Sequence, residues 1–132
     1  MTADSQGEAV GEPFLDRLST ILTQLHPETP HGVVLLCKHF FSGAAAYANG
    51  KIFASLGPAG FAVKLPTQMR SALLKARKGH KFRYFPDAPI KREYVALSKS
   101  TISDQAALRS LISESIKFVT ARPGRHASRK KR

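Results

Sequence analysis

The stretch AYANGKIFASLGPAGFAVKLP (residues 46–66) decides the fold. Short runs of aromatic, β-branched and small residues are separated by the pair Asn49-Gly50 and by the segment GPAG (57–60). An Asn-Gly pair is the strongest short-range hairpin signal, because both residues tolerate the positive φ that a tight turn between strands needs. The stretch therefore predicts consecutive antiparallel strands joined by tight turns, with KIFASL and FAVKL as two of them.

The glycines of this stretch do not match a phosphate-binding loop. A Walker A loop needs G-x-x-x-x-G-K-[ST], and a dinucleotide loop needs G-x-G-x-x-G between a strand and a helix. Here Gly50, Gly57 and Gly60 lie between expected strands. We interpret them as turn residues rather than as ligands of a phosphate.

A helix and three further strands are expected outside this stretch. Apolar residues at spacings of three and four over residues 14–25 predict a helix, and Pro13 suits its first turn. VVLLCKHF (33–40) predicts a buried strand, whereas KFRYF (81–85) and REYVALS (92–98) predict two later ones.

Two more helices are expected after the turns. One begins at Pro66 and ends at Gly79, with Met69, Leu73 and Leu74 facing inward. The last begins near Ser103-Asp104, with Thr101 or Ser103 as its N-cap. The residues expected on its inner face are Leu108, Leu111, Ile112, Ser115, Phe118 and Val119. The order α-β-β-β(β)-α-β-β-α predicts an α+β fold, an antiparallel meander flanked by helices.

The chain length fits one domain of ordinary size. We expect a disordered lead-in (residues 1–12), one α+β domain (13–121) and a flexible basic tail (122–132). The polar N-terminus lacks the basic and apolar regions of a signal peptide, and no apolar run is long enough to span a bilayer. A single cysteine, Cys37, excludes an internal disulfide, so we expect a cytoplasmic protein.

Positive charge is concentrated in two segments. The chain has 21 Lys and Arg against 9 Asp and Glu, and residues 64–92 alone hold nine of the basic side chains against one carboxylate. Such a bias predicts a polyanionic partner, and phosphates of a nucleic acid are the obvious one, although a solvated helix face explains the pattern equally well. The candidate nucleic-acid-binding residues are Lys75, Arg77, Lys78, Lys81, Arg83, Lys91, Arg92, Arg129, Lys130, Lys131 and Arg132.

The segment KGHKFRYF (78–85) partly matches the RNP1 pattern of RNA-binding domains. Alternation places Phe82 and Tyr84 on one face of the expected strand, and His80 stands where that pattern has a stacking aromatic. One apolar core face and one wet face are the simpler explanation.

Catalytic and metal-binding patterns are weak in this chain. Cys37 and His39 share one face of a strand, but no motif places a third group that would orient the pair as a nucleophile and its base. The histidines are scattered, and the carboxylates are few. We expect no catalytic residue, no metal and no cofactor.

The segment KHFFSGAAAYANGKIFASLGPAGFAVKLP resembles the N-terminal domain of the TfoX/Sxy competence-regulator family, which opens with Met-Phe-Gly-Gly. Phe40 and Ser42 replace its Met and first Gly, and IKREYVAL resembles a later strand of the family with Arg92 inserted. The matching positions are Phe41, Gly43, Tyr47, Gly50, Phe53, Ala54, Lys64, Leu65, Pro66, Lys91, Tyr94 and Val95. The resemblance implies a small α+β domain without known catalytic residues.

Together these patterns predict a non-enzymatic regulatory or protein-interaction module with a protein partner still to be identified. The alternative is a nonspecific nucleic-acid-binding domain that uses the basic segment 64–92 and the basic tail. An exposed edge strand could also pair two copies of the chain.

Overall fold

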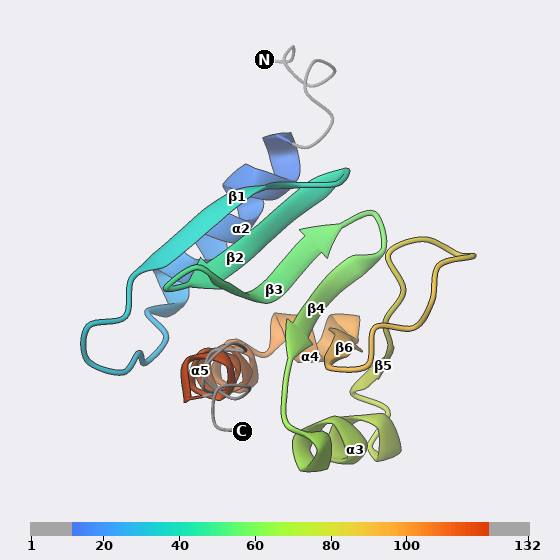
Figure 1. Cartoon of the computed structure of the whole chain (residues 1–132). Coiled ribbons are helices and arrows are strands. Elements are labelled where there is room, and N and C mark those ends of the chain that lie inside the picture. The colour runs from blue at the N-terminus through green and yellow to red at the C-terminus, as the bar shows by residue number, and fades with distance from the viewer. Residues whose placement is uncertain (1–11, 122–132) are drawn as a thin grey trace, which may run out of the picture.

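The computed structural model describes residues 12–121, and the expected lead-in and basic tail lie outside this range, apart from Glu12. The elements, drawn in Figure 1, are α2 (Glu12–Leu25), β1 (Leu35–Phe40), β2 (Gly43–Ala48), β3 (Lys51–Gly57), β4 (Gly60–Lys64), α3 (Thr67–Lys75), β5 (Gly79–Lys81), β6 (Tyr94–Leu97), α4 (Lys99–Ser103) and α5 (Gln105–Ala121). The strands form one six-stranded antiparallel sheet in the order β1-β2-β3-β4-β6-β5. The predicted α+β meander with flanking helices is confirmed.

Both expected hairpin turns are present. Asn49 and Gly50 have φ values of 50° and 80°, and they join β2 to β3 between the paired residues Ala48 and Lys51. The Asn49 side-chain oxygen also accepts a hydrogen bond of 2.8 Å from the Val34 backbone N–H, which ties the turn to the start of β1. The second hairpin closes at the pair Gly57 and Gly60.

The main core lies between one face of the sheet and the helices α2 and α5. Leu18 and Leu22 from α2 and Ile112 and Ile116 from α5 pack against this face, which is built from alternate residues of the strands. A bulge in β3 leaves Phe53 without a partner in β2, and the buried Ser115 hydroxyl donates to its carbonyl at 3.0 Å. The two helices are thus fixed to the same face of the sheet.

The expectation that residues 33–40 form a buried strand is wrong. Strand β1 is an edge strand, and each of its side chains is either half-buried or exposed, with Leu36 54% exposed. The reason is topological: α2 covers one face of β1, and no helix within residues 12–121 covers the other face.

The expected strand 81–85 is also wrong, because β5 ends at Lys81. The next ladder pair would join Phe82 to Tyr94, but their backbone groups are already engaged by Lys91. The Lys91 N–H donates to the Phe82 carbonyl at 2.8 Å, and the Tyr94 N–H donates to the Lys91 carbonyl at 3.1 Å. Residues 82–93 therefore leave the ladder as a loop.

The helix that follows Pro66 ends earlier than expected. It stops at Lys75, and Arg77 adopts the left-handed conformation, with φ of 59°. The N–H groups of Arg77 and Lys78 donate back to the carbonyls of Leu74 and Leu73, as in a Schellman motif. Gly79 is therefore not the terminator. It pairs with Leu97 in the sheet instead.

The last helix, α5, begins at Gln105, close to the expected start at Ser103-Asp104, but neither Thr101 nor Ser103 is its N-cap. A short helix, α4, comes first, with Ser98 as its N-cap, and Asp104 then accepts a side-chain hydrogen bond from the Ala107 N–H at the start of α5. Thr101 does not cap a helix, because its hydroxyl donates to the Lys78 carbonyl at 2.9 Å.

Candidate functional site

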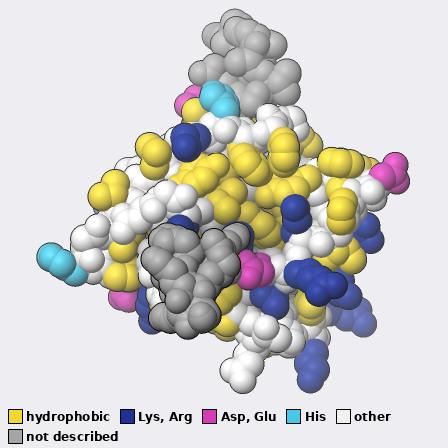
Figure 2. Space-filling model, viewed as in Figure 1, with side chains coloured by type: hydrophobic (Ala, Val, Ile, Leu, Met, Phe, Trp, Pro, Cys, Tyr) yellow, Lys and Arg dark blue, Asp and Glu magenta, His cyan; other side chains and the backbone are white. Residues whose placement is uncertain are grey.

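A basic cleft of about 650 Å³ lies between α3 and residues 89–92. Four cationic side chains line it: Arg70, Lys81, Lys91 and Arg92. None of the described residues that line it is a carboxylate, and Thr67 and Ser71 add hydroxyl groups. Figure 2 shows Lys and Arg side chains gathered at the lower right of the molecule, where α3 lies in Figure 1. The cleft therefore favours anions.

The N-terminal end of α3 adds to this preference. Its N-cap residue is Pro66, whose side chain makes no capping hydrogen bond, so N–H groups of the first turn stay available. The helix dipole places partial positive charge at the same end. Arg70 is held there by donating to the carbonyl of Leu65 at 2.6 Å and to the Thr67 hydroxyl at 3.1 Å.

The face of the sheet opposite α2 and α5 carries a row of small residues. Ala45, Ser55, Ala62 and Ala96 are consecutive partners across β2, β3, β4 and β6. Residues 82–93 pack on this face, and Phe82 forms a second small core there with Ala62 and Ala96. A loop rather than a helix thus covers part of this side of the sheet.

Aromatic rings from distant parts of the chain meet above this row. Tyr84 lies 5.1 Å from Phe41 and 4.8 Å from Phe82, measured between ring centroids, in edge-on contacts. Phe40 lies 5.7 Å from Tyr84. Phe40 and Phe41 come from the junction of β1 and β2, so the cluster joins the β1–β2 junction to the loop between β5 and β6.

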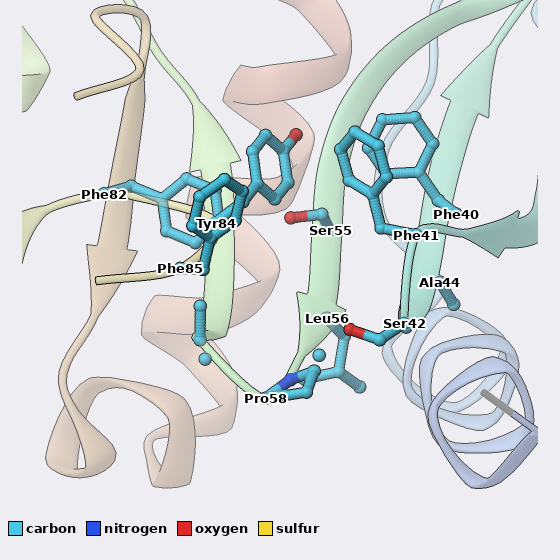
Figure 3. A pocket seen from close by; sticks show the side chains of 14 residues that line it. Phe40, Phe41, Ser42, Ala44, Ser55, Leu56, Pro58, Phe82, Tyr84 and Phe85 are labelled. Carbon is cyan, nitrogen blue, oxygen red and sulfur yellow. The ribbon is translucent and has the colours of Figure 1, made fainter. Parts of the chain in front are cut away.

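An apolar pocket of about 200 Å³ opens beside this cluster. Figure 3 shows Phe40 and Phe41 on one side of it, Tyr84 and Phe85 on the other, and the Ser55 hydroxyl between the two groups. Phe41 is 77% exposed and Phe85 is 60% exposed, so two phenyl rings at the rim face solvent. Phe41 also has a positive φ of 54°, which is unusual for a bulky residue.

A groove of about 350 Å³, the aromatic groove, connects the two features. It shares Lys91, Arg92 and Tyr94 with the basic cleft, and it shares Phe40, Phe41 and Tyr84 with the apolar pocket, as the linings of the three hollows show. Basic cleft, aromatic groove and apolar pocket therefore form one continuous surface.

Burial and cation–π contacts set the electrostatics of the aromatic groove. The Lys91 ammonium lies 5.6 Å from the centroid of the Tyr84 ring. Burial raises the pKa of Tyr94 far above its usual value. The Tyr94 hydroxyl lies 3.4 Å from the Tyr84 hydroxyl. Burial likewise raises the pKa of Tyr84. Both phenols stay neutral at physiological pH, so the fixed charges around the groove are those of its Lys, Arg and Glu side chains.

The basic residues expected to bind nucleic acid are only partly brought together. Lys81, Lys91 and Arg92 line the basic cleft, and Arg83 lines a neighbouring hollow while its guanidinium donates to the Ala88 carbonyl at 2.7 Å. Lys75, Arg77 and Lys78 are exposed at the opposite end of α3. Arg129, Lys130, Lys131 and Arg132 lie outside the described residues. Sequence reasoning missed Arg70 as a site residue.

The residues that matched the family motif have varied places. Phe41 lines the apolar pocket, whereas Gly50 forms the hairpin turn and Pro66 occupies the N-cap position of α3. Gly43 is buried and lines the same pocket, and Tyr94 is buried and lines the aromatic groove. The Tyr47 ring centroid lies 4.7 Å from the Lys38 ammonium. Phe53 is in the main core, and Lys64 pairs with Glu93. Among the aromatics of the RNP1-like segment, Phe82 is only 2% exposed and is not free to stack on a base, whereas Phe85 is 60% exposed.

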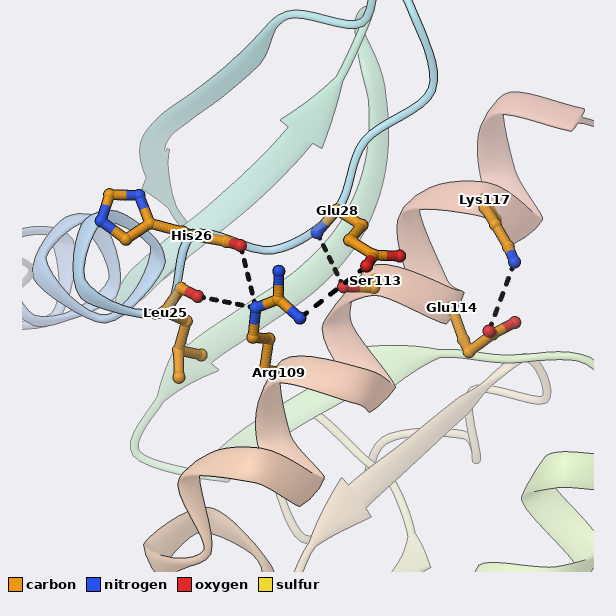
Figure 4. A network of polar contacts seen from close by, with 7 residues as sticks. All are labelled: Leu25, His26, Glu28, Arg109, Ser113, Glu114 and Lys117. Carbon is orange, nitrogen blue, oxygen red and sulfur yellow. Dashed lines mark hydrogen bonds and ion pairs between the residues drawn. The ribbon is translucent and has the colours of Figure 1, made fainter.

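A second polar cluster, on the helix-covered side, ties the segment after α2 to α5 (Figure 4). The Arg109 Nε donates to the carbonyls of Leu25 and His26, both at 3.0 Å, and its guanidinium lies 3.9 Å from the Glu28 carboxylate. The Glu28 N–H donates to the Ser113 hydroxyl at 2.9 Å. These bonds satisfy backbone groups at a helix end, so we assign the cluster a structural role.

The geometry gives the Cys37–His39 pair little support as a nucleophile. Burial raises the pKa of the Cys37 thiol, although a side-chain hydrogen bond with Ser19 lowers it somewhat, and a raised pKa leaves less of the reactive thiolate. Within residues 12–121 no group of three or more His, Cys, Asp or Glu side chains could hold a metal ion. Over the same range no helix is long and apolar enough to cross a membrane.

The sheet, the helices on one of its faces and the loop on the other define a small α+β domain. The basic cleft, the aromatic groove and the apolar pocket form one continuous surface of this domain. The family model described as the TfoX N-terminal domain matches residues 35–119, which is more than half of the chain. The chain therefore belongs to the TfoX N-terminal domain family, as its resemblance indicated. Comparison with curated proteins and with solved structures gave no match.

Proposed function

We propose that this domain is a non-enzymatic, cytoplasmic regulatory module that binds nucleic acid through the basic cleft. The observation that carries the proposal is the lining of the cleft, where Arg70, Lys81, Lys91 and Arg92 converge with no carboxylate among the described lining residues. Phosphate contacts by Lys and Arg supply most of the affinity in nonspecific nucleic-acid binding. The open N-terminal end of α3 favours phosphate at the same place.

The test is fluorescence anisotropy of the full chain with labelled nucleic acid over a salt series. Two double variants each lose two positive charges. One combines Lys91→Gln and Arg92→Gln in the cleft, and the other combines Arg17→Gln in α2 and Lys117→Gln in α5, on the opposite face of the sheet. Each phosphate contact contributes about −0.7 to −0.9 to the slope of log affinity against log salt. The cleft pair is expected to weaken binding and to flatten this slope by roughly 1.5, summed over two contacts.

The control pair is expected to leave both affinity and slope nearly unchanged. Because both variants keep the basic tail, its contribution cancels in the comparison. Equal weakening by the two pairs would show that net charge alone attracts the nucleic acid. Absence of binding near physiological salt, about 0.15 M, would overturn the proposal altogether.

We propose a protein interaction as the second candidate, and the edge strand β1 favours it. Val34 is 67% exposed and Leu36 is 54% exposed beside an unpaired strand edge, where a partner protein or a second copy could add a strand. Light scattering behind size exclusion, with wild type and Leu36→Lys, would detect a second copy. Crosslinking from native lysate would detect another protein. A monomer without crosslinked partners would remove this candidate.

A further inference from the structure

We infer that the nucleic acid is bound as a single strand, with bases stacked on the exposed aromatic rings while its phosphates lie in the basic cleft. The inference rests on the proposed function and adds a partner class to it. It starts from the continuity of the surface: Lys91 and Arg92 line the cleft and also the aromatic groove, and Phe41 and Tyr84 line the groove and also the apolar pocket.

Charge and aromaticity are separated along this surface in the way that a single strand needs. The cationic end has four Lys and Arg side chains for phosphates. The other end presents the phenyl rings of Phe41 and Phe85, which are 77% and 60% exposed. Proteins that bind single strands without sequence preference combine a positively charged groove with aromatic side chains on which bases stack.

Phe41 is held in place as a stacking platform. Its ring lies 4.5 Å from the Phe40 ring and 5.1 Å from the Tyr84 ring, so two neighbours support it while most of its surface remains open to water. Its backbone has φ of 54°, an uncommon conformation for a bulky residue. Strained residues of this kind cluster at binding sites, where the surrounding structure maintains them.

A duplex cannot use the aromatic end of this surface. Its bases are stacked on one another, and their faces become available only after unpairing and unstacking. Duplex DNA would therefore gain from the basic cleft alone. A peptide with an acidic and an apolar part would match the same charges, and the experiment separates it from a single strand by asking whether bases matter.

The experiment measures anisotropy of the full chain with three probes of equal length: a labelled oligothymidylate, the same strand with abasic sites throughout, and a duplex. The abasic strand keeps the phosphates and lacks the bases. Stacking contributes roughly five- to a hundredfold in affinity per base. Wild type is expected to bind oligothymidylate at least about tenfold more tightly than the abasic strand, as one or two stacked bases require.

Phe41→Ala and Phe85→Ala are expected to lower the affinity for oligothymidylate about five- to tenfold and to leave the abasic strand and the duplex unchanged. Phe41→Tyr keeps a stacking ring and should retain the wild-type affinity. Val34→Ala is the matched control, because Val34 is 67% exposed, between Phe85 and Phe41, but lines none of the three hollows.

Equal affinity of wild type for the oligothymidylate and the abasic strand would overturn the inference. So would phenylalanine variants that weaken all three probes alike or none of them. If the cleft pair Lys91→Gln and Arg92→Gln still weakens binding in that case, the proposed function survives without this inference. Failure of every probe to bind would overturn both.

Discussion

Gly43 and Gly57 face each other across β2 and β3, and the structure predicts very different losses of stability when each is replaced by alanine. A Cβ on Gly43 would lie 2.8 Å from the Gly57 Cα and closer still to the carbonyl oxygen of Leu56. Both are backbone atoms of a central strand, which cannot rotate away as a side chain could. A Cβ on Gly57 would lie 3.4 Å from the Gly43 Cα, which is an ordinary van der Waals contact.

The loss of stability can be estimated from how far the added Cβ of Gly43→Ala falls short of normal carbon–carbon packing distance. Carbon atoms pack best at about 3.5–4.0 Å, so β2 and β3 would have to separate locally by about 0.7 Å or more. That shift lengthens the neighbouring ladder hydrogen bonds, each of which contributes about 1 kcal/mol. Together with the usual cost of overpacking, we expect Gly43→Ala to lower the free energy of unfolding by about 3 kcal/mol. The melting temperature should fall by roughly 10 °C.

Urea denaturation followed by far-ultraviolet circular dichroism measures both variants against wild type. Gly57→Ala is the matched control, and its effect should stay within about 1 kcal/mol in either direction, because alanine also restricts the unfolded chain. A Gly43→Ala protein as stable as wild type, with the same dependence on urea, would refute the packing argument. So would equal destabilisation by the two variants.

Variants at three other sites test separate features by denaturation. Gly50→Val should cost roughly 2 kcal/mol of stability from backbone strain alone, since φ is 80° and a Cβ there would contact nothing within 4 Å, whereas Gly50→Asn should cost less. Asp104→Ala should cost about 1 kcal/mol, because it removes the acceptor for the Ala107 N–H at the start of α5; unchanged stability would mean that this cap is dispensable. Burial raises the pKa of Tyr94, so above pH 10 the folded state binds more protons than the unfolded state, and wild type should lose up to about 1.4 kcal/mol per pH unit at this residue. Tyr94→Phe should therefore lose less stability than wild type between pH 8 and pH 11, and equal losses would contradict the assignment.

The parts of the fold that could be predicted are those set by local chemistry. Asn49-Gly50 forms the expected turn because both residues adopt positive φ at little cost within the turn itself. The end of β5 could not be predicted, because it depends on Lys91, ten residues further along the chain, which engages the backbone groups of Phe82 and Tyr94. Arg77 follows α3 in the left-handed conformation that glycine usually adopts at the end of a helix. The sequence pattern therefore pointed to Gly79 as the terminator, and the predicted end of the helix was too late.

The candidate site was predictable in charge but not in shape. The sequence showed a basic segment over residues 64–92, yet the cleft forms only because the first turn of α3 and residues 89–92 approach each other. As a result Arg70 lines the cleft and Lys75 does not, although both residues are in α3. Phe41 matched a family motif, but its packing against Tyr84, 43 residues away, required the fold.

The surface exists because the second face of the sheet is covered by a loop. Small side chains at Ala45, Ser55 and Ala62 leave space above the central strands, and Phe82 and Tyr84 fill that space incompletely. Glu93 is the single carboxylate among the described residues that line the groove, and it lies 3.8 Å from the Lys64 ammonium. That pairing offsets the charge that would repel a phosphate beside Lys91 and Arg92. Lys64→Gln should therefore weaken anion binding, measured by anisotropy, by more than Arg17→Gln does, because it removes a positive charge beside the groove together with this contact to the Glu93 carboxylate.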